Sequence, residues 1–217
     1  MFIMARRALR KLDPALDLAP WLTTFEQLPN PWDAEQLFGR VAPLEVELGS
    51  GKGLFLASAA AARPEHNFLG LEVSAKYAHH IAARLAKAEL AHARIVHGDG
   101  LRVFHDLLPE ASVTAIHVYF PDPWWKARHK KRRVMNEVFV RDAQRTLIAG
   151  GSLHFWTDVE EYFHAGLQCI AEATGLIGPH AEPEQAPEHD LDYRTHFERR
   201  TRLAELPVYR AVFHKPE

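Results

Sequence analysis

Glycines and carboxylates lie close together in residues 47–53, which read Glu-Leu-Gly-Ser-Gly-Lys-Gly. Glycines in such a segment permit a tight turn and let the backbone approach a ligand closely. A further carboxylate, Glu72, lies about 20 residues beyond the turn, a spacing at which an acid can accept hydrogen bonds from both hydroxyls of a ribose. We therefore interpret this region as a binding site for a ligand that contains a nucleoside.

Two classes of nucleoside ligand compete for this site. A dinucleotide-binding turn has a third glycine where this chain has Leu54, and Glu47 would repel a pyrophosphate. S-adenosylmethionine has no phosphate, and its ammonium and sulfonium groups are attracted to a carboxylate. Asp99 adds an acceptor for an adenine amino group. We predict S-adenosylmethionine as the cofactor, bound by Glu47, Gly49, Gly51, Glu72 and Asp99. A nicotinamide dehydrogenase remains an alternative.

Asp122 lies between two prolines in the segment Pro-Asp-Pro-Trp-Trp, residues 121–125. Prolines restrict their own backbone and that of the preceding residue, so the carboxylate of Asp122 is held rigidly. Guanine carries adjacent N–H donors on its Watson–Crick edge, which one carboxylate can accept as a pair. Trp124 or Trp125 could stack on such a base. The alternative is that one Trp belongs to the core and that Asp122 caps a turn.

A dense basic run follows the two tryptophans. Six of the eight residues from Lys126 to Arg133 are Lys or Arg, although the whole chain has a formal net charge of −2. Most charge runs are solvated helix faces. Charges of one sign at this density repel one another unless a polyanion neutralises them, and a basic patch on an acidic body is typical of a localised polyanion site.

Alternating strands and helices must position these motifs. Short, nearly continuous apolar segments predict strands over residues 44–48, 67–73, 93–97, 113–120 and 152–157, with weaker strand candidates at 176–178 and 208–214. Helices are expected between them, including one over 134–149 that Gly150 and Gly151 terminate. This alternation is typical of an α/β fold with a doubly wound, mostly parallel sheet, in which ligands bind at the carboxyl ends of the strands. Every motif above follows such an end.

Two parts of the chain differ in character. Residues 1–40 are predicted to form a basic, partly irregular N-terminal extension with a short helix at 34–40, because residues 13–43 include five prolines. Residues 41–217 form the catalytic domain in this interpretation.

The glycine turn, the sequence PDPWWKARHKKRR and the later Thr-His-Phe-Glu at 195–198 together resemble the bacterial tRNA (guanine-N7)-methyltransferases. The resemblance runs from about Leu44 to the C-terminus. It implies a Rossmann-like class I methyltransferase fold with a seven-stranded sheet whose last strand is antiparallel. It also implies methyl transfer from S-adenosylmethionine to the N7 atom of a guanine in the variable loop of tRNA.

The resemblance also assigns expected roles to individual residues. Asp122 is expected to be the catalytic residue and to contact the cofactor together with the acids predicted above. The expected substrate-binding residues are Lys126, Asp158, Thr195, Phe197 and Glu198. The expected RNA-contacting residues are Arg128, Lys130, Lys131, Arg132 and Arg133.

Two other functions fit part of the pattern. An amine-directed methyltransferase also places a motif similar to Pro-Asp-Pro-Trp after its fourth strand, and Asp122 could hold an exocyclic amine. A non-catalytic RNA-binding module would retain the basic run, but the complete set of acids argues against it.

Composition adds few further constraints. The single cysteine, Cys169, excludes an internal disulfide and fits a reducing, cytoplasmic setting. The chain has 14 histidines, but none stands in a recognised metal-ligand spacing, and no apolar run is long enough for a membrane span. We therefore expect tRNA as partner, no metal, no membrane association, and a monomer or homodimer.

Overall fold

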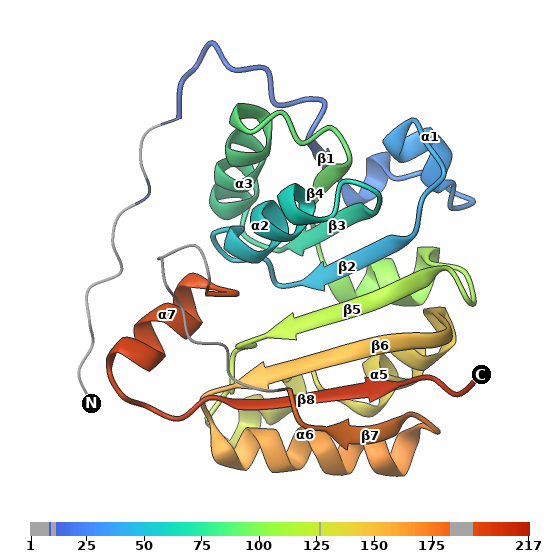
Figure 1. Ribbon diagram of the computed structural model, residues 1–217, viewed down its shortest axis with the longest axis vertical. Coiled ribbons are helices and arrows are strands. Elements are labelled where there is room, and N and C mark those ends of the chain that lie inside the picture. Colours follow the sequence, from blue (N-terminus) through green and yellow to red (C-terminus); the bar gives the residue numbers. More distant parts are fainter. Residues whose placement is uncertain (1–8, 10–11, 126, 183–192) are drawn as a thin grey trace.

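The structure is a computed structural model that describes residue 9 and residues 12–125, 127–182 and 193–217 (Figure 1). It contains an eight-stranded sheet in the order β1-β4-β3-β2-β5-β6-β8-β7. The strands are β1 (Leu22–Thr24), β2 (Leu44–Leu48), β3 (Asn67–Glu72), β4 (Ala93–His97), β5 (Val113–Tyr119), β6 (Leu147–Thr157), β7 (Ile177–His180) and β8 (Tyr209–His214). The pairs from β1 to β6 are parallel, whereas β8 is antiparallel to both of its neighbours.

The predicted fold class and the antiparallel last strand are therefore confirmed, with one strand more than expected. The additional strand is β1, which pairs with β4 along the edge of the sheet. It belongs to the part of the chain for which the prolines predicted an irregular path. The same part contributes Leu28 and Phe38 to the core cluster that contains Leu44 and Val46, so its described residues pack against the sheet.

The helices lie on both faces of the sheet. They are α1 (Ala34–Phe38), α2 (Leu54–Ala62), α3 (Ala75–Lys87), α4 (Gly100–Arg102), α5 (Glu137–Thr146), α6 (Glu160–Ala173) and α7 (His196–Leu203), with 3-10 helices at Phe25–Gln27 and Ala127–Arg132 and a π-helix at Val103–Leu107. On one face Phe55 of α2 and Ile81 of α3 pack in one cluster, and on the other Phe139 of α5 and Tyr162 of α6 pack in a second (Figure 1). The sheet is therefore the middle layer, with a hydrophobic core and a layer of helices on each of its faces.

The order of the strands reverses between β2 and β5. From β2 the chain proceeds outward through β3 and β4, and then returns to place β5 and β6 on the other side of β2 (Figure 1). At such a switch point the loops diverge, which leaves a crevice at the carboxyl ends of the two central strands. The glycine turn follows β2, and the segment that contains Asp122 follows β5.

Two expected helix boundaries were wrong. Helix α5 covers residues 137–146, not 134–149, and the two glycines lie within β6. Val113 pairs with Leu147 while Ala115 pairs with Ser152, so β6 contains an irregularity, and Gly150 takes a φ of 72° there. Helix α7 was not predicted, because its sequence HFERRTRL presents almost no apolar face.

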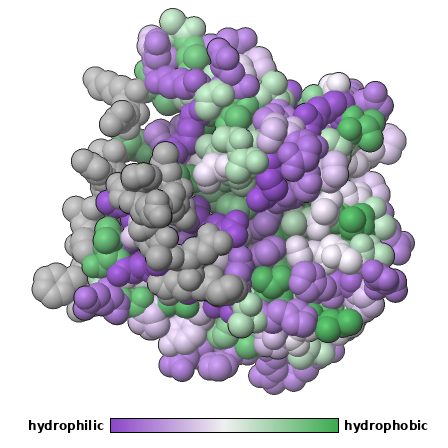
Figure 2. Space-filling view, in the orientation of Figure 1, coloured by the Kyte–Doolittle hydropathy of each residue, from purple (hydrophilic) through white to green (hydrophobic). Residues whose placement is uncertain are grey.

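The surface is mixed in character. Figure 2 shows hydrophilic and hydrophobic residues interspersed over the visible face. No helix within the described part of the chain is both long and apolar enough to cross a membrane.

Candidate functional site

The parallel strands bring the predicted acids to one edge of the sheet. Glu47 lies in β2, Glu72 is the last residue of β3, and Asp99 follows β4. On the other side of β2, Asp122 follows β5 and Asp158 follows β6. The negative charges influence one another, since Glu72 acts on Glu47 and Asp122 acts on Glu72. Residues separated by more than one hundred positions thus line a single edge.

The glycine turn is built for close approach. Gly49, Gly51 and Gly53 have φ angles of 83°, 54° and 67°, which favour glycine. The backbone N–H groups of Gly49 and Ser50 both donate to the carbonyl oxygen of Leu71, at 2.9 and 3.1 Å, and tie the turn to β3. A Cβ atom built on Gly49 or Gly51 would meet nothing within 4 Å. The turn therefore faces open space that a ligand could fill.

Glu72 is fixed in orientation by two backbone donors. Its Oε2 accepts from the N–H of Gly51 at 2.8 Å, and its Oε1 accepts from the N–H of Ser74 at 2.8 Å. Burial raises the pKa of this carboxyl above its ordinary value. Each carboxylate oxygen has a second lone pair, so Glu72 can still accept from a ribose hydroxyl.

Glu47 is buried without full hydrogen bonding. Its Oε2 and the Oγ of Ser50 are buried atoms with no hydrogen-bond partner among the described residues. Burial raises the pKa of Glu47 to about 8; the nearby Ser50 hydroxyl opposes the increase and the charge of Glu72 adds to it. Buried polar atoms in folded proteins are normally paired. A buried carboxyl group whose Oε2 has no partner, beside an open glycine turn, fits a ligand that brings its own cation or donor.

Asp99 has a structural task as well as its predicted one. Its Oδ1 accepts from the N–H of Leu101 at 3.0 Å and thereby caps α4. The side chain is exposed at the strand edge, where it can also reach a ligand.

The segment after β5 has a strained, defined path. Phe120 and Trp124 have φ angles of 51° and 45°, and the N–H of Phe120 donates to the carbonyl oxygen of Trp156 at 2.8 Å. Asp122 lies between them and is exposed. Backbone angles of this kind in residues other than glycine cluster at functional sites.

The two tryptophans have different surroundings. Trp124 is half-buried, with the ring of His129 at 5.6 Å and the guanidinium of Arg132 at 5.1 Å from its ring. Trp125 is 66% exposed. Of the two tryptophans, Trp125 is the more exposed.

The basic run includes the 3-10 helix Ala127–Arg132. Arg128 and Arg132 are exposed. Lys126 lies outside the described residues, and so do the side chains of Lys130 and Lys131. Arg133 differs from these two arginines: it is 7% exposed, and its Nε donates to the carbonyl oxygen of Pro123 at 2.8 Å.

Helix α7 lies beside the carboxyl ends of β5 and β6 (Figure 1). Thr195 caps it, with a side chain that accepts from the N–H of Glu198 at 2.9 Å. The buried carboxylate of Glu198 accepts from the backbone of Arg194 at 2.7 Å and pairs with Arg202 and Arg210 at 3.3 and 3.4 Å. The Thr-x-x-Glu spacing is that of a helix start, a signal that could have predicted α7.

Phe197 and Asp158 complete the substrate-binding set that the sequence predicted. Phe197 is 37% exposed, and its ring lies 5.0 Å from that of Phe120. Asp158 is half-buried; burial raises the pKa of its carboxyl, and the charge of Arg200 on α7 opposes the increase.

A buried polar network beneath this edge was not predicted. Nε2 of His117 on β5 lies 2.8 Å from Oε2 of Glu45 on β2, and the rings of His117 and His154 on β6 stack at 4.8 Å. Burial alone would raise the pKa of Glu45, but His117 and Arg63 lower it to about 2. The network joins three central strands into a rigid support for the site.

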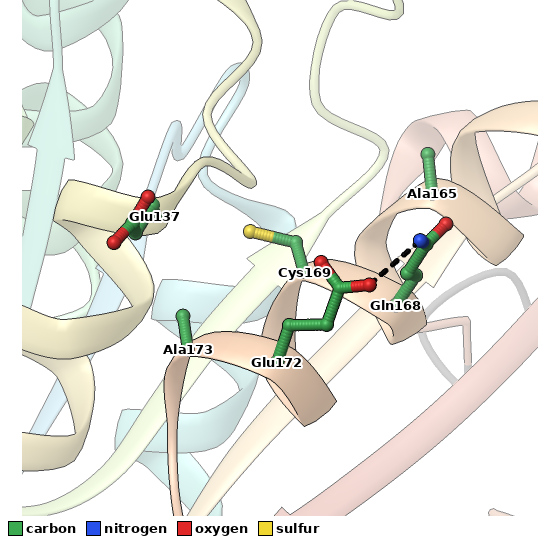
Figure 3. Close-up of a pocket in the computed structure, with 6 residues that line it drawn as sticks. All are labelled: Glu137, Ala165, Gln168, Cys169, Glu172 and Ala173. Carbon is green, nitrogen blue, oxygen red and sulfur yellow. Dashed lines mark hydrogen bonds between the residues drawn. The ribbon is translucent and has the colours of Figure 1, made fainter.

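Pockets elsewhere lack comparable chemistry. Figure 3 shows a pocket on α6, where Cys169 lies between Glu137 of α5 and Glu172. Burial, together with these two carboxylates, raises the pKa of the Cys169 thiol, which disfavours the reactive thiolate. Among residues 12–125, 127–182 and 193–217 there is no group of three or more His, Cys, Asp or Glu side chains that could hold a metal ion.

Comparison with known proteins extends this picture. A family model described as "Putative methyltransferase" matches residues 41–211. A tRNA (guanine-N(7)-)-methyltransferase of Rhodopirellula baltica is 49% identical over 218 residues, which cover 98% of this chain and 80% of the relative. One from Yersinia enterocolitica is 34% identical, covering 88% of this chain and 80% of the relative.

Solved structures share the fold at low sequence identity. The 16S rRNA methyltransferase KamB has a TM-score of 0.62 at 18% identity, with 84% of this chain and 92% of that chain covered. The aminoglycoside resistance methyltransferase NpmB1 has a TM-score of 0.56 at 19% identity, with 87% and 94% covered.

Proposed function

This chain belongs to the tRNA (guanine-N7)-methyltransferase family, and from that premise we propose that it methylates a guanine of the tRNA variable loop, with Asp122 orienting the base. The reaction transfers the methyl group of S-adenosylmethionine to N7 of guanine in tRNA. We further propose that the protein acts in the cytoplasm on tRNA and needs no metal. The observation that carries the assignment of the site is the unpaired, buried Oε2 of Glu47 beside the open glycine turn.

The residues around the turn fit S-adenosylmethionine part by part. Glu47 would hold the ammonium and sulfonium end, where a positive charge offsets the burial of its carboxylate. Glu72 would accept from the ribose hydroxyls, and Asp99 from the adenine amino group. Gly49 and Gly51 would let the backbone lie directly against the ligand, because neither position carries a Cβ atom.

Asp122 and Phe197 would hold the guanine. Asp122 is exposed beside Glu72 at the mouth of the crevice, where its carboxylate can accept from the adjacent N–H donors of the base. Phe197 and Trp125 offer partly and largely exposed rings at the same edge. We place Lys126, Asp158, Thr195 and Glu198 around the same substrate by their match to the family motif.

The chemistry of N7 explains why the site needs no general base. The lone pair of N7 lies in the plane of guanine and carries no proton. When bound, S-adenosylmethionine would supply a methyl group on a positively charged sulfur, so that formation of the N7–C bond would break the C–S bond and leave its electron pair on sulfur. The positive charge passes to the guanine ring. The Asp122 carboxylate then stabilises a charge that grows in the transition state, and positioning contributes the remainder.

The target guanine must leave its stack to reach this site. In an A-form helix N7 faces a deep, narrow groove that side chains barely enter. A base in a loop can be turned outward at lower cost than a paired one. The exposed Arg128 and Arg132 would hold the phosphates around it.

Incubation of the purified chain with an unmodified tRNA transcript and S-adenosylmethionine tests the proposal. Mass spectrometry of the nucleosides should show 7-methylguanosine, and fragment mapping should place it in the variable loop. A transcript with adenine at that position serves as the matched control and should stay unmodified. A methyl group on an exocyclic amine, or at a guanine elsewhere, would overturn the assignment.

A further inference from the structure

Arg133 ends the basic run but does not share its exposure. Only 7% of the residue is exposed, whereas Arg128 and Arg132 are exposed residues. A guanidinium that neutralises a phosphate must be reachable from outside the protein. The charge pattern in the sequence groups Arg133 with its neighbours, and the fold separates it from them.

The guanidinium of Arg133 is held by the protein on three sides. Its Nε donates to the carbonyl oxygen of Pro123 at 2.8 Å. A terminal nitrogen lies 3.5 Å from Oε1 of Glu161, and the group stands 4.7 Å from the centre of the Tyr162 ring. Glu161 and Tyr162 both belong to α6, so the Arg133 side chain connects the segment after β5 to that helix.

The surroundings of Arg133 are themselves fixed. Tyr162 is fully buried, and its hydroxyl oxygen accepts from the N–H of Met135 at 3.2 Å. The carbonyl oxygen of Arg133 accepts from the side-chain amide of Asn136, which caps α5. The guanidinium is therefore anchored to fixed surroundings, and its Nε hydrogen bond ties the Pro123 carbonyl to them.

The Pro123 carbonyl group directly follows Asp122, the proposed catalytic residue. It belongs to the peptide between Pro123 and Trp124, in the segment bounded by the strained residues Phe120 and Trp124, and the hydrogen bond links position 123 to position 133. We infer that Arg133 is a positioning residue: it holds the Asp122–Pro123 segment against α6 and aims the carboxylate, and it is not a phosphate ligand. The inference rests on the proposed role of Asp122.

Lysine cannot reproduce this geometry. A planar guanidinium can lie over a ring while it donates in its own plane, whereas an ammonium is a point charge with strong hydration. Arg133→Lys keeps the positive charge and most of the aliphatic side chain but loses the planar guanidinium. The variant therefore tests whether the charge alone is sufficient or the planar donor is required.

The salt dependence of tRNA affinity distinguishes an arginine that contacts a phosphate from one that positions another residue. Each phosphate contact contributes about 0.7–0.9 to the slope of log affinity against log salt. Arg133→Lys and Arg133→Ala should leave that slope for tRNA binding at the wild-type value and lower kcat at least about tenfold, with little change in KM. Arg128→Ala should lower the affinity and the slope. Arg141→Ala, on an exposed pair with Glu137 in α5, is the control that should change neither.

The opposite pattern would refute the inference. A fall of the slope by about 0.7–0.9 in an Arg133 variant would identify a phosphate contact, and an unchanged kcat would remove the positioning role. Millimolar guanidinium should restore part of the kcat of Arg133→Ala without altering KM, as expected if a small cation refills the site. Absence of 7-methylguanosine from the wild type would contradict the proposed function instead, and the binding slopes would still decide the role of Arg133.

A measurement on the wild type avoids any folding defect of the variants. Phenylglyoxal modifies accessible guanidinium groups, and mass spectrometry locates the modified residues. Arg128 should react in the free protein and be protected by tRNA, whereas Arg133 should remain unmodified in both states. Reaction of Arg133 that tRNA prevents would overturn the inference.

Discussion

The ring of Phe197 lies 5.0 Å from the ring of Phe120, so a helix near the C-terminus rests on the end of the strand that leads to Asp122. The two residues are far apart in the chain, and neither strand nor helix pairing brings them together. The contact makes α7 one wall of the proposed base site. If the proposed base site is correct, a change in α7 should reach it through Phe120.

Phe197→Ala should weaken this wall. An aromatic pair contributes about 0.5–1.5 kcal/mol beyond its buried area, so kcat/KM for tRNA should fall up to about tenfold. Leu203→Ala removes an apolar side chain that is 61% exposed on the same helix and is the matched control. Equal effects of the two changes, in steady-state kinetics at one salt concentration, would contradict the role of the aromatic contact.

Asp122→Ala should remove most of the turnover. Loss of one preorganised electrostatic group in an active site typically lowers kcat about 100- to 1,000-fold. S-adenosylmethionine should still bind, because Glu47 and Glu72 remain, and calorimetry measures that affinity. Asp106→Ala changes an acid that pairs with Arg102 on the surface and should keep normal activity. Near-normal turnover of Asp122→Ala would end the assignment.

The two tryptophans should respond differently to truncation. Stacking of a base on an aromatic ring is worth about 1–3 kcal/mol, so Trp125→Ala should raise KM for tRNA about 5- to 150-fold with little change in thermal stability. Trp124→Ala should mainly lower the thermal midpoint, since its ring packs against His129 and Arg132. The reverse pattern would exchange their roles.

Cofactor binding should release a proton from Glu47. The pKa of this carboxyl is about 8 in the free protein, so the group is mostly protonated at pH 7. A cation placed beside it lowers that pKa, and up to about one proton should leave on binding. Affinity should rise as the pH increases toward 8. Calorimetry in buffers of different ionisation enthalpy measures the release, which Glu47→Gln should abolish; equal release by both proteins would refute the linkage.

The same pKa predicts how the stability of the free protein depends on pH. A carboxyl whose folded pKa is raised binds its proton more tightly in the folded than in the unfolded state. Its contribution to the free energy of unfolding is therefore complete below pH 4.5 and is lost as the pH rises toward 8. Glu47→Gln should flatten this part of the profile, as measured by denaturant unfolding at several pH values.

Gly53→Ala and Gly39→Ala form a matched pair. Both glycines have positive φ, 67° and 72°, so either substitution strains the backbone by roughly 1–2 kcal/mol. A Cβ atom at Gly53 would also lie 2.7 Å from Cγ1 of Ile81, whereas one at Gly39 would meet nothing within 4 Å. Gly53→Ala should therefore lower the free energy of unfolding further and weaken cofactor binding. Equal losses would show that strain alone matters.

The central strands and the acids at their ends were predictable because local pattern decides them. Residues 44–48 have an apolar residue at every second position and residues 67–72 are mostly apolar; both strands are buried along their length, with Glu47 in the first and Glu72 at the end of the second. The edge strand β1 and helix α7 have no such pattern. Their three and eight residues are held by pairing with β4 and by the ion pairs of Glu198.

The role of an individual charge was not predictable. Arg132 and Arg133 are adjacent and chemically identical, yet one is exposed and the other is enclosed by α6. The difference depends on where Tyr162 lies after folding, and sequence distance carries no information on that contact. The helix end predicted at Gly150 and Gly151 was wrong for a related reason, because two adjacent glycines occur both at helix ends and in irregular strands.

The two outer strands of the sheet have a consequence for how molecules of this protein meet. β1 contributes three residues and β7 four, and β7 includes Pro179, which has no N–H to donate. Long, flat outer strands act as templates on which a second chain can add its own backbone, and short ones do not. In the described part of the chain the sheet therefore ends in two strands that are poor templates for backbone pairing with a second chain.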